Sequence, residues 1–164
     1  MSINIGTDNI SEFYIGADKI SEIYIGSDLV YQSSTDRVIF PPRTTEWIRE
    51  GASTGSYADD TVVVAMCNGS SQTNGQMRTV IDFTDFNYLE FDATSRKSGN
   101  AFTAITLNKK VYTGLDGATG VANPNGHYRI NIANLTGNNT LWLCTWGSTG
   151  GANITLTNIT LKKE

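Results

Sequence analysis

The sequence is poor in the residues on which most enzymes and metal sites depend. Its 164 residues include two cysteines, Cys67 and Cys144, and one histidine, His127. At these spacings the three residues do not form the ligand set of a metal site. The one Gly-x-Ser-x-Gly match, GASTG at residues 51–55, lies in a Gly/Ser-rich loop rather than between a predicted strand and a helix, and no phosphate-binding loop occurs in the chain. We therefore predict a protein without catalytic residues, cofactor or bound metal.

Two further groups of residues are weaker candidates for a catalytic or metal-binding site. Paired carboxylates occur at Asp59–Asp60 and at Asp82 with Asp85, and a glycosidase needs two carboxylates across a cleft. These positions are more typical of turns. Asp116 lies in a Gly-rich loop and could contribute to a structural Ca²⁺ site. His127 follows a turn signal, which favours an exposed or hydrogen-bonding side chain over a catalytic base.

Positive charge is also scarce, with 12 Lys and Arg against 16 Asp and Glu. Nucleic-acid binders gather basic residues on one face, whereas here no more than two are adjacent, in the isolated pairs Arg96–Lys97, Lys109–Lys110 and Lys162–Lys163. No apolar run approaches the roughly 20 residues that span a membrane. The start, MSINIGTDNI, lacks a secretory signal. We expect no nucleic-acid partner, no membrane insertion, and synthesis in a cytoplasm without Sec-type export unless a signal has been removed.

The residues that are abundant indicate β-structure. Apolar residues make up 39% of the chain and charged residues 17%, and the remainder is mostly Thr, Ser, Asn and Gly. Threonine fits a pleated surface, and Gly and Asn accept turn geometry. Both cysteines lie in apolar strand patterns, VVVAMCNG and LWLCTWG, which favours buried free thiols over a disulfide. The composition predicts an all-β fold.

A ten-residue repeat opens the chain. Residues 5–14 read IGTDNISEFY, residues 15–24 read IGADKISEIY, and residues 25–31 read IGSDLVY. Each unit is predicted to be one strand followed by a Gly-x-Asp-x turn, which gives a meander of three or four short strands over residues 1–32.

Such a repeat cannot bury an apolar face by itself, because a few short strands are too small. We expect it to anchor or oligomerise the protein through another copy of the chain or a partner protein. Packing on the following domain is the alternative. The predicted contact residues are Ile5, Ile10, Phe13, Tyr14, Ile15, Ile20, Ile23, Tyr24, Ile25, Val30 and Tyr31.

The remainder is predicted to be a junction over 33–60 and a β-sandwich over 61–164. Pro41–Pro42 excludes a helix or central strand in the junction. From Thr61 onward, apolar and polar residues alternate in about eight short segments, which indicates a two-sheet sandwich, a jelly roll. Near the C-terminus the alternation changes parity, so we predict a β-bulge at Asn158.

Two tryptophans give the one candidate ligand surface. Trp142 and Trp146 lie four residues apart on a predicted strand and share a face with Cys144, while Leu141 and Leu143 take the other. If the leucine face is core, the tryptophans are either covered, by residues 47–48 or another subunit, or open to stack on sugars.

Parts of the sequence resemble known proteins. The opening IGADKISEIYIGSDLVYQ resembles N-terminal segments of bacteriophage and prophage structural proteins. VIDFTDFNYLEFDA, YRINIANLTGNNTLWLCTW and NITLTNITLKK resemble carbohydrate-binding-like jelly rolls of phage tail, baseplate and head-fibre proteins. The resemblance implies a protein of the virion, made in the host bacterial cytoplasm, and carries over no ligand residue.

Two hypotheses follow. The first is a non-enzymatic virion protein (decoration, fibre or tail-adhesion component) that binds other virion proteins, self-associates as a homotrimer by fibre analogy, and touches a host cell-surface glycan. The alternative is a bacterial carbohydrate-binding module or adhesin that binds glycan at Trp142 and Trp146.

Overall fold

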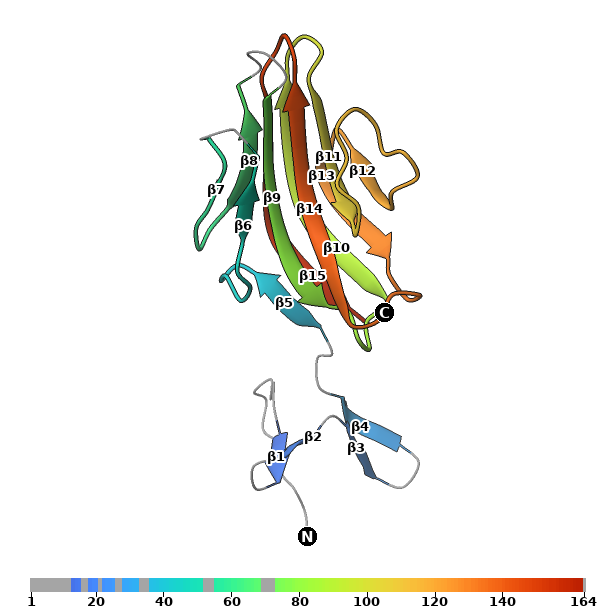
Figure 1. Cartoon of the computed structure of the whole chain (residues 1–164). Helices are drawn as coiled ribbons and strands as arrows, with labels where there is room; N and C mark the ends of the chain where they lie inside the picture. Colours follow the sequence, from blue (N-terminus) through green and yellow to red (C-terminus); the bar gives the residue numbers. More distant parts are fainter. Residues whose placement is uncertain are drawn as a thin grey trace. The chain divides into compact units, whose positions relative to one another are not determined.

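The computed structural model describes residues 36–51, 55–68 and 73–163, together with the backbone of four short strands within residues 13–32 (Figure 1). The chain divides into two compact units, Met1–Asp36 and Arg37–Glu164. None of the described residues belongs to a helix of the length and apolarity needed to cross a membrane.

The four N-terminal strands form two antiparallel hairpins, β1 with β2 and β3 with β4. Ile15 pairs with Asp18 in the first hairpin, and Ile25 pairs with Asp28 in the second. These pairs are ten residues apart, so the hairpins are successive copies of the repeat. The strands are β1 (Phe13–Ile15), β2 (Asp18–Ile20), β3 (Glu22–Ile25) and β4 (Asp28–Gln32).

The repeat differs from the predicted unit of one strand and one turn. Asp18 and Asp28, expected in turns, begin strands β2 and β4. In the described residues the two hairpins are separate two-stranded sheets and not a continuous meander. The predicted contact residues Ile5 and Ile10 lie outside the described residues.

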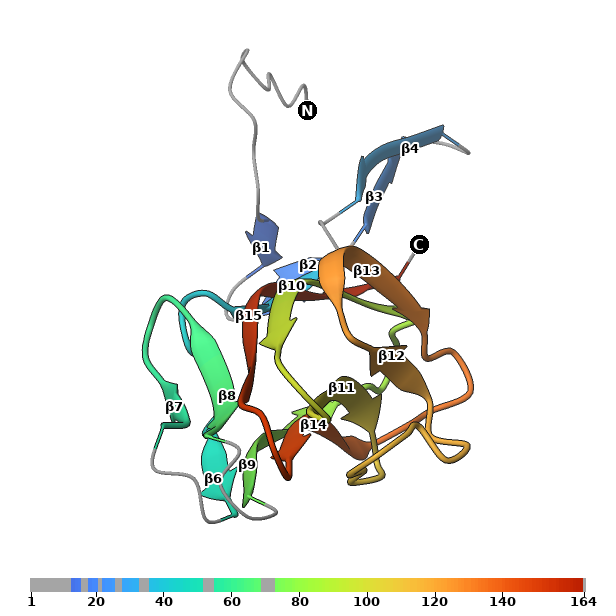
Figure 2. The same ribbon diagram turned by 90° about the horizontal axis from the view of Figure 1, so that it is seen from above.

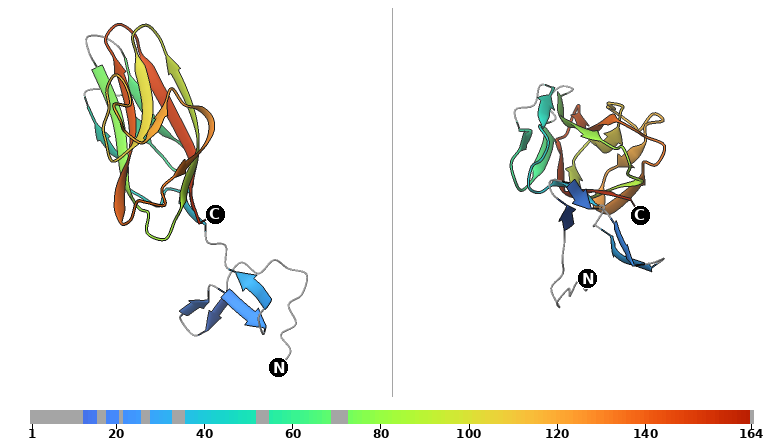
Figure 3. Two further views of the ribbon diagram at one scale, coloured as in Figure 1. Left: turned by 90° about the vertical axis from the view of Figure 1, so that its right-hand side faces the viewer. Right: turned by 90° about the horizontal axis from the view of Figure 1, so that it is seen from below.

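The unit Arg37–Glu164 is a sandwich of two facing antiparallel sheets (Figure 2). One sheet has the order β13-β10-β15-β8-β7, and β5 also pairs with β15. The other has the order β12-β11-β14-β9-β6. This confirms the predicted all-β sandwich of jelly-roll type, which Figure 3 shows from two further sides. The strands are β5 (Arg37–Phe40), β6 (Ile48–Glu50), β7 (Tyr57–Ala58), β8 (Val63–Cys67), β9 (Thr73–Asp82), β10 (Tyr88–Lys97), β11 (Phe102–Leu107), β12 (Gly120–Ala122), β13 (Asn125–Asn131), β14 (Asn138–Gly147) and β15 (Ala152–Lys162).

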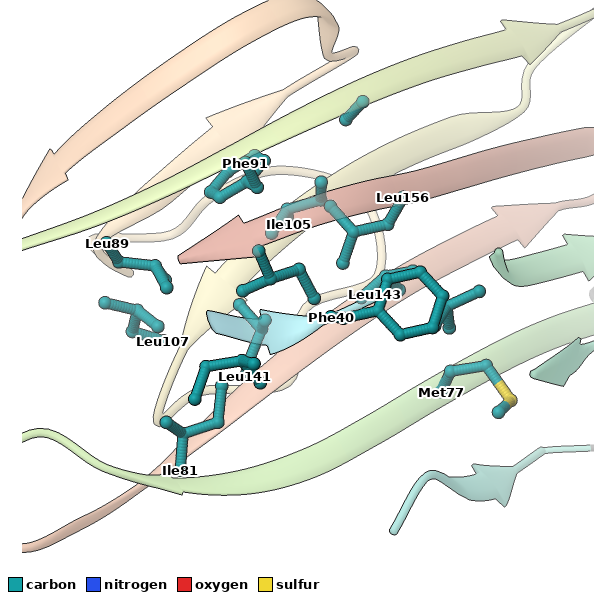
Figure 4. Close-up of a cluster of buried hydrophobic side chains, with 14 of the residues drawn as sticks. Phe40, Met77, Ile81, Leu89, Phe91, Ile105, Leu107, Leu141, Leu143 and Leu156 are labelled. Atoms are coloured by element: carbon teal, nitrogen blue, oxygen red, sulfur yellow. The ribbon is translucent and has the colours of Figure 1, made fainter. Parts of the chain in front are cut away.

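The core lies between the two sheets and is built by alternate residues of each long strand. Leu89 and Phe91 of β10 point inward from one sheet, and Leu141 and Leu143 of β14 point inward from the other (Figure 4). All four side chains are fully buried. Burial of a side chain of this size stabilises the fold by roughly 1.5–3 kcal/mol, so the period-two pattern is enough to define the sandwich.

The segment assigned to a junction contributes three strands to the sandwich. β5 pairs with the C-terminal half of β15, while β8 pairs with its N-terminal half. Phe40 and Trp47 are buried in the same core as the long strands. Pro41–Pro42 follow β5 immediately, where they end the strand without removing a ladder hydrogen bond. The sandwich therefore begins at Arg37, because apolar side chains of this segment fill the space beside β15.

The predicted β-bulge is present at Asn158. Glu90 of β10 pairs with Thr160 and Asp92 pairs with Thr157, so two residues of β15 face Phe91 alone. Asn158 has φ 54°, and its Nδ2 donates a hydrogen bond of 2.6 Å to Oδ2 of Asp92. The bulge keeps inward-facing side chains on both halves of β15 despite their opposite parity in the sequence.

Substitutions at Asn158 test the bulge. Asn158→Val should lower the free energy of unfolding by roughly 2–4 kcal/mol, because it loses the hydrogen bond to Asp92 and a β-branched residue is also strained at positive φ. Asn158→Gly loses the hydrogen bond to Asp92 and should lower it by about 1 kcal/mol, because glycine accepts positive φ without strain. Urea denaturation measures both values. Equal losses in the two variants would contradict the bulge geometry.

Gly120, at the start of β12, tests how closely this edge strand approaches β11. A Cβ at Gly120 would lie 2.1 Å from the carbonyl oxygen of Ile105 and 2.8 Å from Cα of Thr106. Both are backbone atoms, so Gly120→Ala should lower the free energy of unfolding by roughly 1–3 kcal/mol, the usual cost of overpacking. Gly114→Ala is the matched control, since its Cβ would meet only the end of the Asp116 side chain. If urea denaturation gives the same stability for both variants, β12 does not sit this close to β11.

Candidate functional site

The outer face of the five-stranded sheet carries the two tryptophans singled out in the sequence. Leu141 and Leu143 of β14 point into the core, as predicted. Trp142, Cys144 and Trp146 alternate with them and lie on the outer face. Trp142 and Trp146 are both partly exposed, whereas Cys144 is fully buried.

The segment 108–119, between β11 and β12, covers the centre of this face. Val111 of that segment is buried against Cys144 and Ala104, and Leu115 and Trp142 pack on the same cluster. Burial raises the pKa of the Cys144 thiol above its usual value. The outer face is thus partly covered by the chain's own loop. Residues 47–48, the cover considered from the sequence, do not supply it, because Trp47 is buried in the main core and Ile48 is exposed.

A network of three charged residues surrounds Trp142. The Arg78 guanidinium lies 5.7 Å from the centre of the Trp142 ring, and the Lys110 ammonium lies 5.3 Å from it. Glu50 bridges the two cations, accepting a hydrogen bond of 2.5 Å from Nε of Arg78 and one of 3.1 Å from Nζ of Lys110. The bond from Arg78 contributes most to lowering the pKa of Glu50, against the opposing effect of burial.

Exposed apolar side chains border these charges. Ile48 of β6 is paired with Arg78, and Val80 lies two residues further along β9 on the same face. The Lys110 ammonium is also 5.9 Å from the ring centre of Tyr112. The side chains of Ile48, Val80 and Tyr112 are among the large apolar side chains that the fold leaves exposed. We call this surface the Trp142 platform; it comprises Ile48, Glu50, Arg78, Val80, Lys110, Tyr112 and Trp142.

Gln76 lies next to the platform with unmet hydrogen-bonding capacity. It is paired with Cys144 on one side and with Glu50 on the other. Its side chain is fully buried, and neither Nε2 nor Oε1 has a hydrogen-bond partner among the described residues. Each such group costs about 1–3 kcal/mol.

Trp146 lies apart from Trp142 on the same strand. It is paired with Phe102 on β11 and with Asn74 on β9. Four residues along a strand correspond to about 13 Å, and Cys144 beneath Val111 lies between the two rings. The structure therefore does not bring the tryptophans together, and only a ligand several sugar units long would reach both.

The opposite sheet carries a second polar surface. His127, predicted to be exposed or hydrogen-bonding, is both: it lies exposed in β13, and its Nδ1 is 2.9 Å from Oδ1 of Asp92. A depression of 220 Å³ beside this pair is lined also by threonine side chains of β10 and β15. Hydrogen bonds, first from Asn158 and then from His127, lower the pKa of Asp92. Nearby, Arg129 stacks 3.9 Å from the Tyr88 ring centre and pairs with Glu90 at 3.5 Å.

The remaining chemical candidates have structural roles. Oδ1 of Asp59 accepts hydrogen bonds from the backbone N–H groups of Thr61 and Val62, and Oδ1 of Asp82 accepts from that of Thr84. These are turn interactions, as the sequence indicated. Cys67 and Cys144 are free and buried. In the part of the chain that the structure describes, no group of three or more His, Cys, Asp or Glu side chains could hold a metal ion.

For the predicted N-terminal contact residues that are described, the structure gives the strand in which each lies. Phe13, Tyr14 and Ile15 lie in β1 and Ile20 in β2. In the second hairpin, β3 contains Ile23, Tyr24 and Ile25, and β4 contains Val30 and Tyr31.

The platform residues missed by sequence reasoning are Glu50, Arg78, Val80, Lys110 and Tyr112. Arg78 alternates with inward residues of β9, so its outward direction was readable from the sequence. Its meeting with Glu50 was not, because 28 residues separate them. Neither was the meeting of Glu50 with Lys110, 60 residues away.

Solved structures to which this chain is similar include the following two. No family model and no curated protein matches the chain. The structure of the carbohydrate-binding module TmCBM61 in complex with β-1,4-galactotriose has a TM-score of 0.46 and 12% identity, covering 72% of this chain and 88% of that one. The structure of infectious bursal disease virus Gt strain has a TM-score of 0.20 and 13% identity, covering 94% of this chain and 44% of that one. At these scores neither likeness bears on what this chain binds.

Proposed function

We propose that the sandwich is a non-catalytic sugar-binding domain and that the Trp142 platform is its binding surface. The observation that carries the proposal is a partly exposed tryptophan ring surrounded by exposed apolar side chains and by charged hydrogen-bonding groups. A sugar presents an apolar C–H face and a rim of hydroxyls. Stacking on the ring would bury the C–H face, while Glu50 and the two cations would bond the hydroxyls.

The partial burial of the charged groups supports this role. The side chains of Arg78, Lys110 and Glu50 are exposed by 28%, 28% and 30%. Their mutual bonds hold them in place, so less side-chain freedom is lost when a ligand binds. A preorganised polar rim around an aromatic ring is the arrangement that gives a small ligand both affinity and orientation.

The opposite sheet provides a natural comparison. Tyr88, Arg129 and Glu90 form a similar group of aromatic ring, cation and carboxylate there. That group has one cation for one carboxylate, and its Arg129 lies close over the ring. Arg129 lies 3.9 Å from the centre of the Tyr88 ring, whereas Lys110 and Arg78 lie 5.3 and 5.7 Å from that of Trp142, so more of the Trp142 ring is left for a sugar.

Alanine substitutions on the two faces test the proposal. Trp142→Ala should reduce affinity for a bound glycan about tenfold or more, since loss of the stacked ring removes at least 1.4 kcal/mol. Tyr112→Ala, at an exposed position, should weaken binding without affecting folding. Trp146→Ala should matter only for long oligosaccharides. A glycan array followed by titration calorimetry of the best ligand measures these effects.

Tyr88→Ala is the matched control and should leave glycan affinity unchanged. Thermal unfolding of each variant separates loss of binding from loss of fold. The proposal fails if the array shows no binding, or if Trp142→Ala and Tyr112→Ala bind as the unaltered protein does.

We further propose that the N-terminal repeat joins this domain to an assembly, such as a virion. The specific observation is that the described strands form two separate hairpins of the same repeat. An isolated two-stranded hairpin is marginally stable in water, so covering by a second copy or another particle protein would stabilise it. A homotrimer by fibre analogy is the simplest form of this proposal.

The mass in solution tests the assembly. The chain has a mass of 17.8 kDa, and light scattering should give a multiple of it. The double substitution Ile15→Asp and Ile25→Asp, which places a charge at the same position of both hairpins, should shift the mass toward 17.8 kDa. Tyr57→Asp, at an exposed position of β7, should not. A monomer at micromolar concentration would contradict self-association.

A further inference from the structure

The Trp142 platform carries more positive than negative charge. Arg78 and Lys110 both bond to Glu50, so two cations share one carboxylate. Three other ion pairs among the described residues each join one base to one acid: Arg43 with Asp60, His127 with Asp92, and Arg129 with Glu90. An excess positive charge thus sits on a protein whose net charge is −4.

Arg78 and Lys110, which carry the excess charge, are partly buried, and this strengthens their attraction for an anion. About seven tenths of the Arg78 and Lys110 side chains is shielded from water, since each is 28% exposed. Solvent and salt screen such charges less than fully exposed ones. The region around the Trp142 ring is therefore an attractive place for an anionic group.

Arg78 also keeps bonding capacity. Its bond to Glu50 uses Nε, and no carboxylate among the described residues bonds its two terminal nitrogens. Guanidinium and carboxylate groups match in a planar, two-bond geometry. Lys110 contributes a second, compact positive charge 5.3 Å from the centre of the ring that would stack the sugar.

We infer that the ligand of the Trp142 platform is an acidic glycan, whose sugar ring stacks on Trp142 and whose carboxylate binds Arg78 and Lys110. This inference rests on the proposed sugar-binding function. Glu50 has a defined part in it. Its charge holds the two cations in place but also opposes the incoming carboxylate.

The test begins with an array of glycans that end in sialic or uronic acid, printed beside the neutral parents that lack the acidic group. The acidic glycan should bind at least about tenfold more tightly than its parent, which corresponds to one charge-assisted contact. Its affinity should fall roughly tenfold between about 0.05 and about 0.5 M NaCl, whereas the affinity for any neutral parent should change little.

Variants of the charged residues sharpen the test. Lys110→Met should weaken binding of the acidic glycan about tenfold more than it weakens binding of the neutral parent, which loses a hydroxyl contact alone, while Lys110→Arg should retain the preference. Glu50→Gln should strengthen binding of the acidic glycan roughly two- to threefold. Arg129→Met, in the similar group on the opposite sheet, is the matched control and should change neither affinity.

The possible outcomes separate the two proposals. Neutral parents that bind as tightly as their acidic forms, with little dependence on salt, would overturn the inference and leave the sugar-binding function standing. An acidic preference that survives in Lys110→Met would also overturn it, because the charge would then be read elsewhere. If no glycan of either class binds the folded protein, the proposed function fails and the inference fails with it.

Discussion

The alternation of side chains along β14 is the constraint on which both the core and the platform depend. β14 is paired along its whole length with β9 and over six residues with β11, which fixes its register on both sides. Leu141 and Leu143 therefore point into the core, and Trp142 must point outward. A shift by one residue would place both tryptophans in the core and expose the leucines. The position of the Trp142 ring is thus secured by the same burial that stabilises the sandwich.

The charged residues on the outer face come from chain segments that are distant in sequence. β6 brings Glu50 to one side of β9, and the segment 108–119 brings Lys110 over β14. Val111 of that segment is buried against Cys144. The free thiol of Cys144 therefore packs in a cluster and is not exposed on the surface. The loop covers the centre of the face, whereas Trp142 and Trp146 on either side of Cys144 stay partly exposed.

The two units of the chain differ in how much apolar surface each can bury by itself. The sandwich buries a continuous cluster of apolar side chains between its two sheets. The N-terminal repeat forms hairpins that have no third strand among the described residues. A repeat of this kind becomes stable by addition of neighbours, whereas a sandwich is complete once its two faces meet. This contrast is the reason to look for recognition in the sandwich and for assembly in the repeat.

The sequence by itself determined the all-β class, the sandwich from Thr61 onward, the bulge at Asn158, and the separation of Leu141 and Leu143 from Trp142. Each depends on local alternation, which a strand converts directly into inside and outside. Only the tertiary structure decided that the segment after Arg37 belongs to the sandwich and that Glu50, Arg78 and Lys110 meet at Trp142. These contacts join residues up to 60 positions apart, and sheet order, which local patterns do not encode, brings them together.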